Sequence, residues 1–102
     1  TVKIERITAN PLTVTKNDQV IIEYNFYSVD SSNEETGTGT ATWKVGSSVV
    51  ATSTAAQGKN SFDITPYMSV GRQKILLSIT DEAGTIATKS WDVQILDLYI
   101  DF

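Results

Sequence analysis

Cysteine and histidine are both absent from this 102-residue sequence. Without cysteine the chain can form no disulfide framework, and without histidine it lacks the commonest metal ligand and general base. No serine or threonine has a histidine to activate it as a nucleophile, and no glycine-rich loop leads into a lysine and a helix that could hold a phosphate. These absences argue against an enzyme, and we expect the protein to carry no cofactor.

Long apolar runs and an excess of positive charge are also missing. No apolar run approaches the roughly 18 residues of a membrane-spanning helix, so no membrane insertion is expected. Twelve acidic residues against 8 basic residues give a formal net charge of −4. Because a nucleic-acid surface needs a basic stripe, we expect no nucleic-acid partner. The sequence has no initiator methionine, signal peptide or charged leader, which suggests a piece of a longer chain.

The composition that is present favours β-structure. Threonine, isoleucine and valine number 14, 10 and 9. Their branched Cβ atoms fit a pleated sheet better than a helix. Leucine and alanine, the main helix formers, number only 5 and 7. At this length, near the common size of one domain, the sequence predicts a single all-β domain with one core.

The segment 73–95 predicts one long β-hairpin. Apolar residues alternate along both of its arms, at Ile75, Leu77 and Ile79 and then at Trp91, Val93 and Ile95. Between the arms, Asp81 suits the first position of a type I turn, and Gly84 supplies the positive φ that follows such a turn. This hairpin is the element around which the rest of the chain is expected to fold.

Other alternating segments predict further strands, separated by turn-forming residues. Asn10-Pro11 should split the first strand, because proline lacks a backbone donor and restricts the residue before it. The polar segment 30–40 predicts a surface loop, and 65–71 predicts a compact turn with one helical turn. In chain order the expected strands are 2–15, 20–27, 41–45, 48–53, 61–64, 73–80 and 85–95.

Short strands separated by turns at intervals of about 8 to 12 residues are typical of a two-sheet sandwich. The expected fold class is all-β, an immunoglobulin-like two-sheet antiparallel β-sandwich of about seven strands. Trp43 then falls on the third strand, where such folds bury a tryptophan between the sheets. The disulfide of antibody domains is missing, so we expect Tyr24, Phe26 and Ile79 to fill its volume by packing.

Three motifs carry a resemblance to a known family. They are Thr80-Asp81-Glu82-Ala83-Gly84 and Thr88-Lys89-Ser90-Trp91 in the last hairpin, and NDQVIIEYNFY at the second strand. In these motifs the sequence resembles the bacterial and bacteriophage immunoglobulin-like (Big-type) domains, over nearly its whole length. The resemblance implies a building block found in tandem in bacterial surface proteins and in phage tail, baseplate or other virion structural proteins. It also implies a location that is extracellular, at the cell surface or in the virion, and assistance in adhesion to cell surfaces.

The domain is expected to cover residues 1–96, and the apolar tail 97–102 is expected to begin the connection to a following domain. A sandwich of this strand order has its two chain ends at opposite ends of the molecule, so copies can join end to end. We therefore expect a non-enzymatic structural, spacer or display module. Its expected partners are the neighbouring domains of the same chain, together with a glycan or protein of a cell surface.

Acidic residues gather in two loops that such a sandwich places at the same end. Asp30, Glu34 and Glu35 belong to the first loop, and Asp81 and Glu82 belong to the second. Ca²⁺ takes about six to eight oxygen ligands, so converging carboxylates and backbone carbonyls are one way to bind it. The spacing matches no calcium loop. Solvated acidic loops, with Asp81 as a turn residue, are therefore the preferred interpretation, and Ca²⁺ binding is the alternative.

The alternative function is a carbohydrate- or receptor-binding module that uses the loops at one end of the sandwich. Its candidate ligand-binding residues are Glu34, Glu35, Asp81, Glu82 and Tyr27. Tyr27 should face solvent on the second strand, where its ring could stack on a sugar. Few other aromatic residues are expected to be exposed, so the spacer interpretation is preferred.

Overall fold

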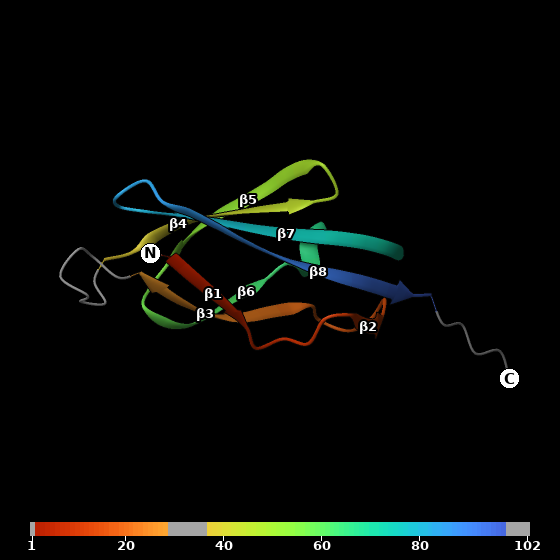
Figure 1. Cartoon of the computed structure of the whole chain (residues 1–102). Coiled ribbons are helices and arrows are strands. Elements are labelled where there is room, and N and C mark those ends of the chain that lie inside the picture. Colours follow the sequence, from red (N-terminus) through yellow and green to blue (C-terminus); the bar gives the residue numbers. More distant parts are fainter. Residues whose placement is uncertain (1, 29–36, 98–102) are drawn as a thin grey trace, which may run out of the picture.

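The computed structural model describes residues 2–28 and 37–97 of the chain. These residues form two β-sheets that pack face to face (Figure 1), so the expected all-β sandwich is confirmed. The described part contains eight strands and one 3₁₀ turn. They are β1 (Val2–Arg6), β2 (Leu12–Thr15), β3 (Ile21–Ser28), β4 (Gly39–Val45), β5 (Ser48–Ala55), β6 (Gly58–Asp63), η1 (Thr65–Tyr67), β7 (Gly71–Asp81) and β8 (Ile86–Leu96).

The N-terminal segment contributes to both sheets. The smaller sheet has the order β1-β3-β6 and the larger has the order β2-β8-β7-β4-β5. The first predicted strand is split at Asn10-Pro11, as expected, and this peptide bond is cis. Before the break, β1 pairs antiparallel with β3, and after it β2 pairs parallel with β8 in the other sheet. The two layers are thus connected by the opening residues of the described chain.

The predicted central hairpin is present as β7 and β8. Its ladder runs without interruption from the pair Gly71 and Ile95 to the pair Thr80 and Ile86. The Gly84 N–H donates to the Asp81 carbonyl over 3.0 Å, and Gly84 has a φ of +86°. The turn between the arms is therefore the one that the aspartate and the glycine predict.

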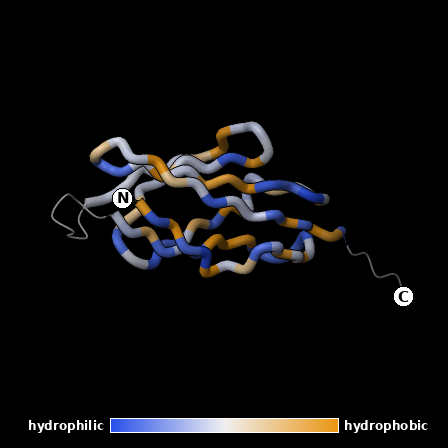
Figure 2. The backbone as a smooth tube through the Cα atoms, viewed as in Figure 1, coloured by the Kyte–Doolittle hydropathy of each residue, from blue (hydrophilic) through white to orange (hydrophobic). Residues whose placement is uncertain are grey.

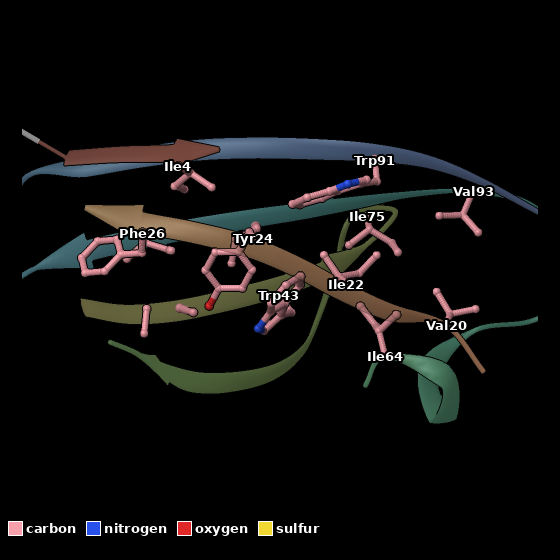
Figure 3. Close-up of a cluster of buried hydrophobic side chains, with 14 of the residues drawn as sticks. Ile4, Val20, Ile22, Tyr24, Phe26, Trp43, Ile64, Ile75, Trp91 and Val93 are labelled. Atoms are coloured by element: carbon pink, nitrogen blue, oxygen red, sulfur yellow. The ribbon is translucent and has the colours of Figure 1, made fainter. Parts of the chain in front are cut away.

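The core lies between the sheets and follows the alternation of the strands (Figure 2). In β3, buried Ile22, Tyr24 and Phe26 alternate with partly exposed neighbours. Their side chains form a row in Figure 3, with Trp43 and Trp91 on opposite sides of the row in this view. The core consists of Ile4, Val20, Ile22, Tyr24, Phe26, Ala41, Trp43, Ala55, Ile64, Ile75, Leu77, Ile79, Trp91, Val93 and Ile95.

Trp43 is at the centre of an aromatic cluster, as its predicted place between the sheets requires. Its ring makes an edge-to-face contact with Tyr24, with centroids 5.8 Å apart, and stacks on Phe62 at 4.6 Å. The indole Nε1 donates a hydrogen bond of 3.1 Å to Ser53 Oγ. Burial of Tyr24 beside this ring raises the pKa of its hydroxyl to about 12. The apolar and polar parts of Trp43 are therefore both satisfied inside the protein.

Two segments that the sequence predicts as loop or turn are strand in the structure. Gly39 and Thr40 begin β4, and residues 54–59 largely belong to β5 and β6. Glycine and alanine dominate the inward positions here, so no large apolar side chain marks the alternation. In β5 the register shifts opposite Trp43, which leaves Val50 as the extra residue of a bulge. The bulge explains how two successive valines fit, since Val49 is exposed and Val50 is partly buried.

Candidate functional site

The end of the sandwich that carries the β7–β8 turn is the first candidate site, because the acidic residues were predicted to meet there. Asp30, Glu34 and Glu35 lie outside the described residues. Asp81 and Glu82 are described, and they lie near Gly37 and Thr38, at the point where the chain leads into β4 (Figure 1). The described residues thus include the second acidic loop and only the last positions of the first.

Asp81 is a buried structural residue. Its side chain is only 9% exposed, on the inward face of β7 at the end of the core. One carboxylate oxygen, Oδ1, accepts hydrogen bonds from the backbone N–H groups of Ala83 (3.0 Å) and Thr85 (2.8 Å). The other, Oδ2, accepts one from Ser28 Oγ (3.1 Å) on the opposite sheet. Asp81 thus fixes its own turn and connects the two layers.

The electrostatics of Asp81 do not suit catalysis. The Thr85 N–H, assisted by the Ser28 hydroxyl and the Ala83 N–H, holds the pKa of Asp81 below its ordinary value. A carboxylate with a lowered pKa is a weaker base, and Ser28 already donates its proton to it. Three hydrogen bonds thus stabilise the ionised form of this buried carboxylate, which opposes proton uptake from a substrate.

Glu82 and Gln57 complete a polar cluster at this end. Glu82 Oε1 accepts hydrogen bonds from the backbone N–H (3.3 Å) and the hydroxyl (3.4 Å) of Thr38. The Gln57 side chain exchanges two hydrogen bonds of 3.2 Å with the backbone of Ser28. It therefore continues the ladder at the end of β3 as another strand would.

The sequence analysis missed the partners in this cluster. Ser28 is separated from Ile22, Tyr24 and Phe26 by even numbers of residues, so the alternation of a strand places its side chain on the inward face. A serine at the inward end of a strand was the available signal for a buried polar contact. Gln57 and Thr38 gave no comparable signal, because their partners are far from them in sequence.

We expect Asp81 to contribute to stability in a way that depends on pH. Its pKa in the folded state lies below the ordinary value of about 3.9, so ionised Asp81 stabilises the fold above that pH, and this contribution is lost as the pH falls through the folded-state pKa. Asp81→Asn and Asp81→Ala should both melt several degrees below the parent at pH 7, the alanine variant lower. Thermal melts down to about pH 2.5 should show the gap between the parent and Asp81→Asn closing.

Asp92→Asn is the matched control, because Asp92 is exposed and its carboxylate accepts no hydrogen bond within the described part of the chain. This variant should melt close to the parent throughout. A gap between the parent and Asp81→Asn that stays constant with pH would contradict the role assigned to the charged form.

Tyr27 lies on the outward face of β3, as predicted, and is partly buried. Its cross-strand neighbour is Lys3 of β1, which places the ring within a mixed polar surface. Among the described aromatic residues, only Tyr67 is classed as exposed, at 43%. Tyr67 belongs to η1, so it does not share a strand with Tyr27. No aromatic platform for a sugar is formed within the described structure.

The described structure also lacks a preformed metal cluster and a membrane-spanning helix. Within residues 2–28 and 37–97, no group of three or more aspartate, glutamate, histidine or cysteine residues is placed to hold a metal ion. No helix in the same residues is long and apolar enough to cross a membrane. No model of a known protein family matches the sequence, and a search of curated proteins found no match.

Proposed function

We propose that this chain is a non-enzymatic immunoglobulin-like module that acts as a spacer or display unit in a larger extracellular or virion protein. The strand order supports this proposal. With β1 to β8 lettered A, A′, B, C, C′, E, F and G, the two sheets read A-B-E and A′-G-F-C-C′. A first strand divided between the two sheets and a tryptophan buried on strand C agree with the same assignment.

The observation that carries the spacer role is the parallel pairing of β2 with β8. Leu12 to Thr15 lie opposite Val93 to Leu96 in the same direction. The start of β1 and the end of β8 lie toward opposite ends of the sandwich (Figure 1). A pull on the two ends of the chain therefore moves β2 and β8 past each other along their axes. Several ladder hydrogen bonds must then break together, and such an arrangement resists force.

Single-molecule unfolding in two pulling geometries tests this role. In the first, the handles are attached to the first and last residues. In the second, one handle is attached to Val70→Cys, a unique and exposed thiol site, and the other to the last residue. The second geometry opens the β7–β8 ladder from one end, pair by pair. We expect one cooperative event in the first geometry, at a clearly higher force than in the second.

Val14→Pro is the control for that experiment. Proline in β2 removes a backbone donor from a short strand, so the end-to-end force should fall while the force in the second geometry stays nearly unchanged. Equal forces in the two geometries of the parent would remove the support for a spacer.

The loops at the β7–β8 end are a weaker basis for function. Both oxygens of Asp81 and one oxygen of Glu82 already accept hydrogen bonds from the protein. A ligand that used these oxygens would compete with the bonds that already hold the turn in place. We therefore do not propose recognition through these two residues.

A further inference from the structure

A groove crosses the outward face of the larger sheet, away from the β7–β8 turn. It lies where β2, β8 and β7 are neighbours and is lined by residues 11–13, 92–94 and 72–74. Its volume is about 590 Å³. Small-molecule sites commonly enclose about 300 to 1,000 Å³, so the groove can hold a ligand of two or three sugar units at its surface.

The register of the sheet arranges the polar side chains of the groove in two rows. Thr13, Gln94 and Arg72 are direct neighbours across β2, β8 and β7, and Asp92 and Lys74 form the next row. These residues have the opposite parity to the buried Ile75, Trp91 and Val93, so their side chains point away from the core. The groove therefore presents a hydroxyl, an amide, one carboxylate and two cations on a rigid sheet.

Among residues 2–28 and 37–97, the two cations of the groove have no ion-pair partner. Three other lysines, Lys3, Lys16 and Lys59, pair with Glu5, Asp97 and Glu23, at 3.9, 2.6 and 2.9 Å, whereas Lys44 and Lys89 form no ion pair within the described residues. Arg72 and Lys74 make no such pair within the described residues, although Asp92 lies across the ladder from Lys74. Arg72, Lys74 and Lys44 form a basic strip on this face. Lys44 of β4 belongs to it because its cross-strand partner, Leu76, lies two residues from Lys74 on β7. A basic strip on a chain of net charge −4 is a local inversion of charge.

We propose that this groove binds an acidic polysaccharide with one carboxylate on each sugar, a polyuronate. The planar guanidinium of Arg72 suits bidentate pairing with a carboxylate, and Lys74 adds a second positive charge. Asp92 can accept hydrogen bonds from sugar hydroxyls, and Gln94 and Thr13 can both donate and accept them. A ligand that alternates one charge with several hydroxyls matches this mixture, and its binding adds to the spacer role without depending on it.

Other classes of ligand fit the groove less well. No aromatic ring of the described residues lines it, so a neutral sugar would find no such ring on which to stack. A single-stranded nucleic acid would likewise find no ring among the described lining residues on which its bases could stack, and its phosphates would meet Asp92. The hydroxyls of a uronate can instead pair with Asp92, Gln94 and Thr13.

A ¹⁵N-HSQC titration of the full 102-residue chain with trigalacturonate tests the proposal. Exposed ion pairs are individually weak, so we expect a dissociation constant on the order of 1 mM, and tighter apparent binding to the polymer through many contacts. Shifts should be confined to residues 13, 72–74 and 92–94 and should shrink as salt is added. The double variant Arg72→Gln/Lys74→Gln should bind at least about tenfold more weakly, because both charged partners are lost.

The matched control is Lys3→Gln/Lys59→Gln, which removes the same charge from the other sheet and should bind like the parent. Arg72 and Lys74 are exposed and make no side-chain hydrogen bond in the described structure, so their double variant should keep a dispersed spectrum. Equal binding of neutral maltotriose, stronger binding of a short single-stranded DNA, shifts at residues 81–84 instead, or an unchanged affinity in the double variant would each overturn the proposal.

Discussion

Replacement of Trp43 by alanine should remove about 3–5 kcal/mol from the free energy of unfolding. The side chain is fully buried and contacts Tyr24 and Phe62 through its ring. Its removal leaves a cavity between two sheets whose backbones are fixed by ladders on either side, so the walls can collapse only in part. Because small domains are stable by only about 5–15 kcal/mol, this single change should leave the chain marginally folded.

Urea denaturation followed by circular dichroism measures this loss, with Tyr67→Ala as the control. Tyr67 is an aromatic residue of similar size, 43% exposed in η1, and its removal should cost about 1 kcal/mol or less. If Trp43→Ala proved no more costly than Tyr67→Ala, the assignment of Trp43 to the centre of the core would be wrong.

Trp43→Phe separates the stability that comes from the aromatic ring of Trp43 from the stability that comes from its indole hydrogen bond. Phenylalanine keeps an aromatic ring beside Tyr24 but leaves Ser53 Oγ without the indole donor. We expect a loss smaller than that of the alanine variant, composed of one hydrogen bond of about 1 kcal/mol and a smaller cavity. A loss as large as that of Trp43→Ala would mean that the polar contact, rather than the ring, dominates.

The hairpin of β7 and β8 was predictable from local information alone. Its apolar residues follow the period of a strand, and the turn between Asp81 and Gly84 has the residue types that its backbone requires. The break at Asn10-Pro11 was predictable for the same reason, since proline acts on its immediate neighbours. β2 joins the other sheet because it pairs with β8, a strand some 80 residues away, and no rule based on neighbouring residues predicts this pairing.

The polar contacts were the least predictable part of the structure. From the sequence, the acidic turn is expected to be solvated, with Asp81 as a turn residue, or to bind a ligand. In the structure the oxygens of Asp81 accept two hydrogen bonds from its own turn and one from Ser28. The two bonds within the turn agree with its role as a turn residue. The third comes from the other sheet, and it appears only when the register of both sheets is known.

The groove on the larger sheet was invisible for a related reason. Arg72, Lys74 and Asp92 each follow the outward parity of a strand, so the sequence pattern describes them as an ordinary solvated face. The charge inversion arises because β2, β8 and β7 are neighbours, which brings Arg72 and Lys74 together beside the single carboxylate of Asp92. A site made by register across three strands has no signature in any one of them.

Gly39 was predicted to lie in the surface loop 30–40, but it begins β4. Its replacement should have a large effect on the stability of the domain. Gly39 is a buried residue in β4, where a Cβ atom would lie 2.5 Å from Ile79 Cγ2 and 3.0 Å from Phe26 Cζ. Both neighbours are completely buried and have little room to move. Glycine is required here because there is no room for a side chain. The backbone conformation does not require it, since the φ of Gly39 is not among the positive values found at the other described glycines.

We therefore expect Gly39→Ala to destabilise the domain by about 1–3 kcal/mol, the cost of overpacking a core. In a strand with unstrained φ the same substitution would usually stabilise by about 0.4–1 kcal/mol, through the lower entropy of the unfolded chain. The sign of the change in urea denaturation thus reports the packing against Ile79. Thr40→Ala, on the exposed face of the same strand, should have little effect.

A double-mutant cycle with Ile79→Ala assigns the cost of Gly39→Ala to its contact. Ile79→Ala removes the Cγ2 atom that the new methyl group would meet, so the two changes together should cost less than the sum of the separate losses. The coupling should exceed about 0.5 kcal/mol, the level at which residues in contact depart from additivity. Additive losses, or a stabilising Gly39→Ala, would show that β4 can shift away from β7 to admit the methyl group, and the close packing assigned to this end of the core would then be wrong.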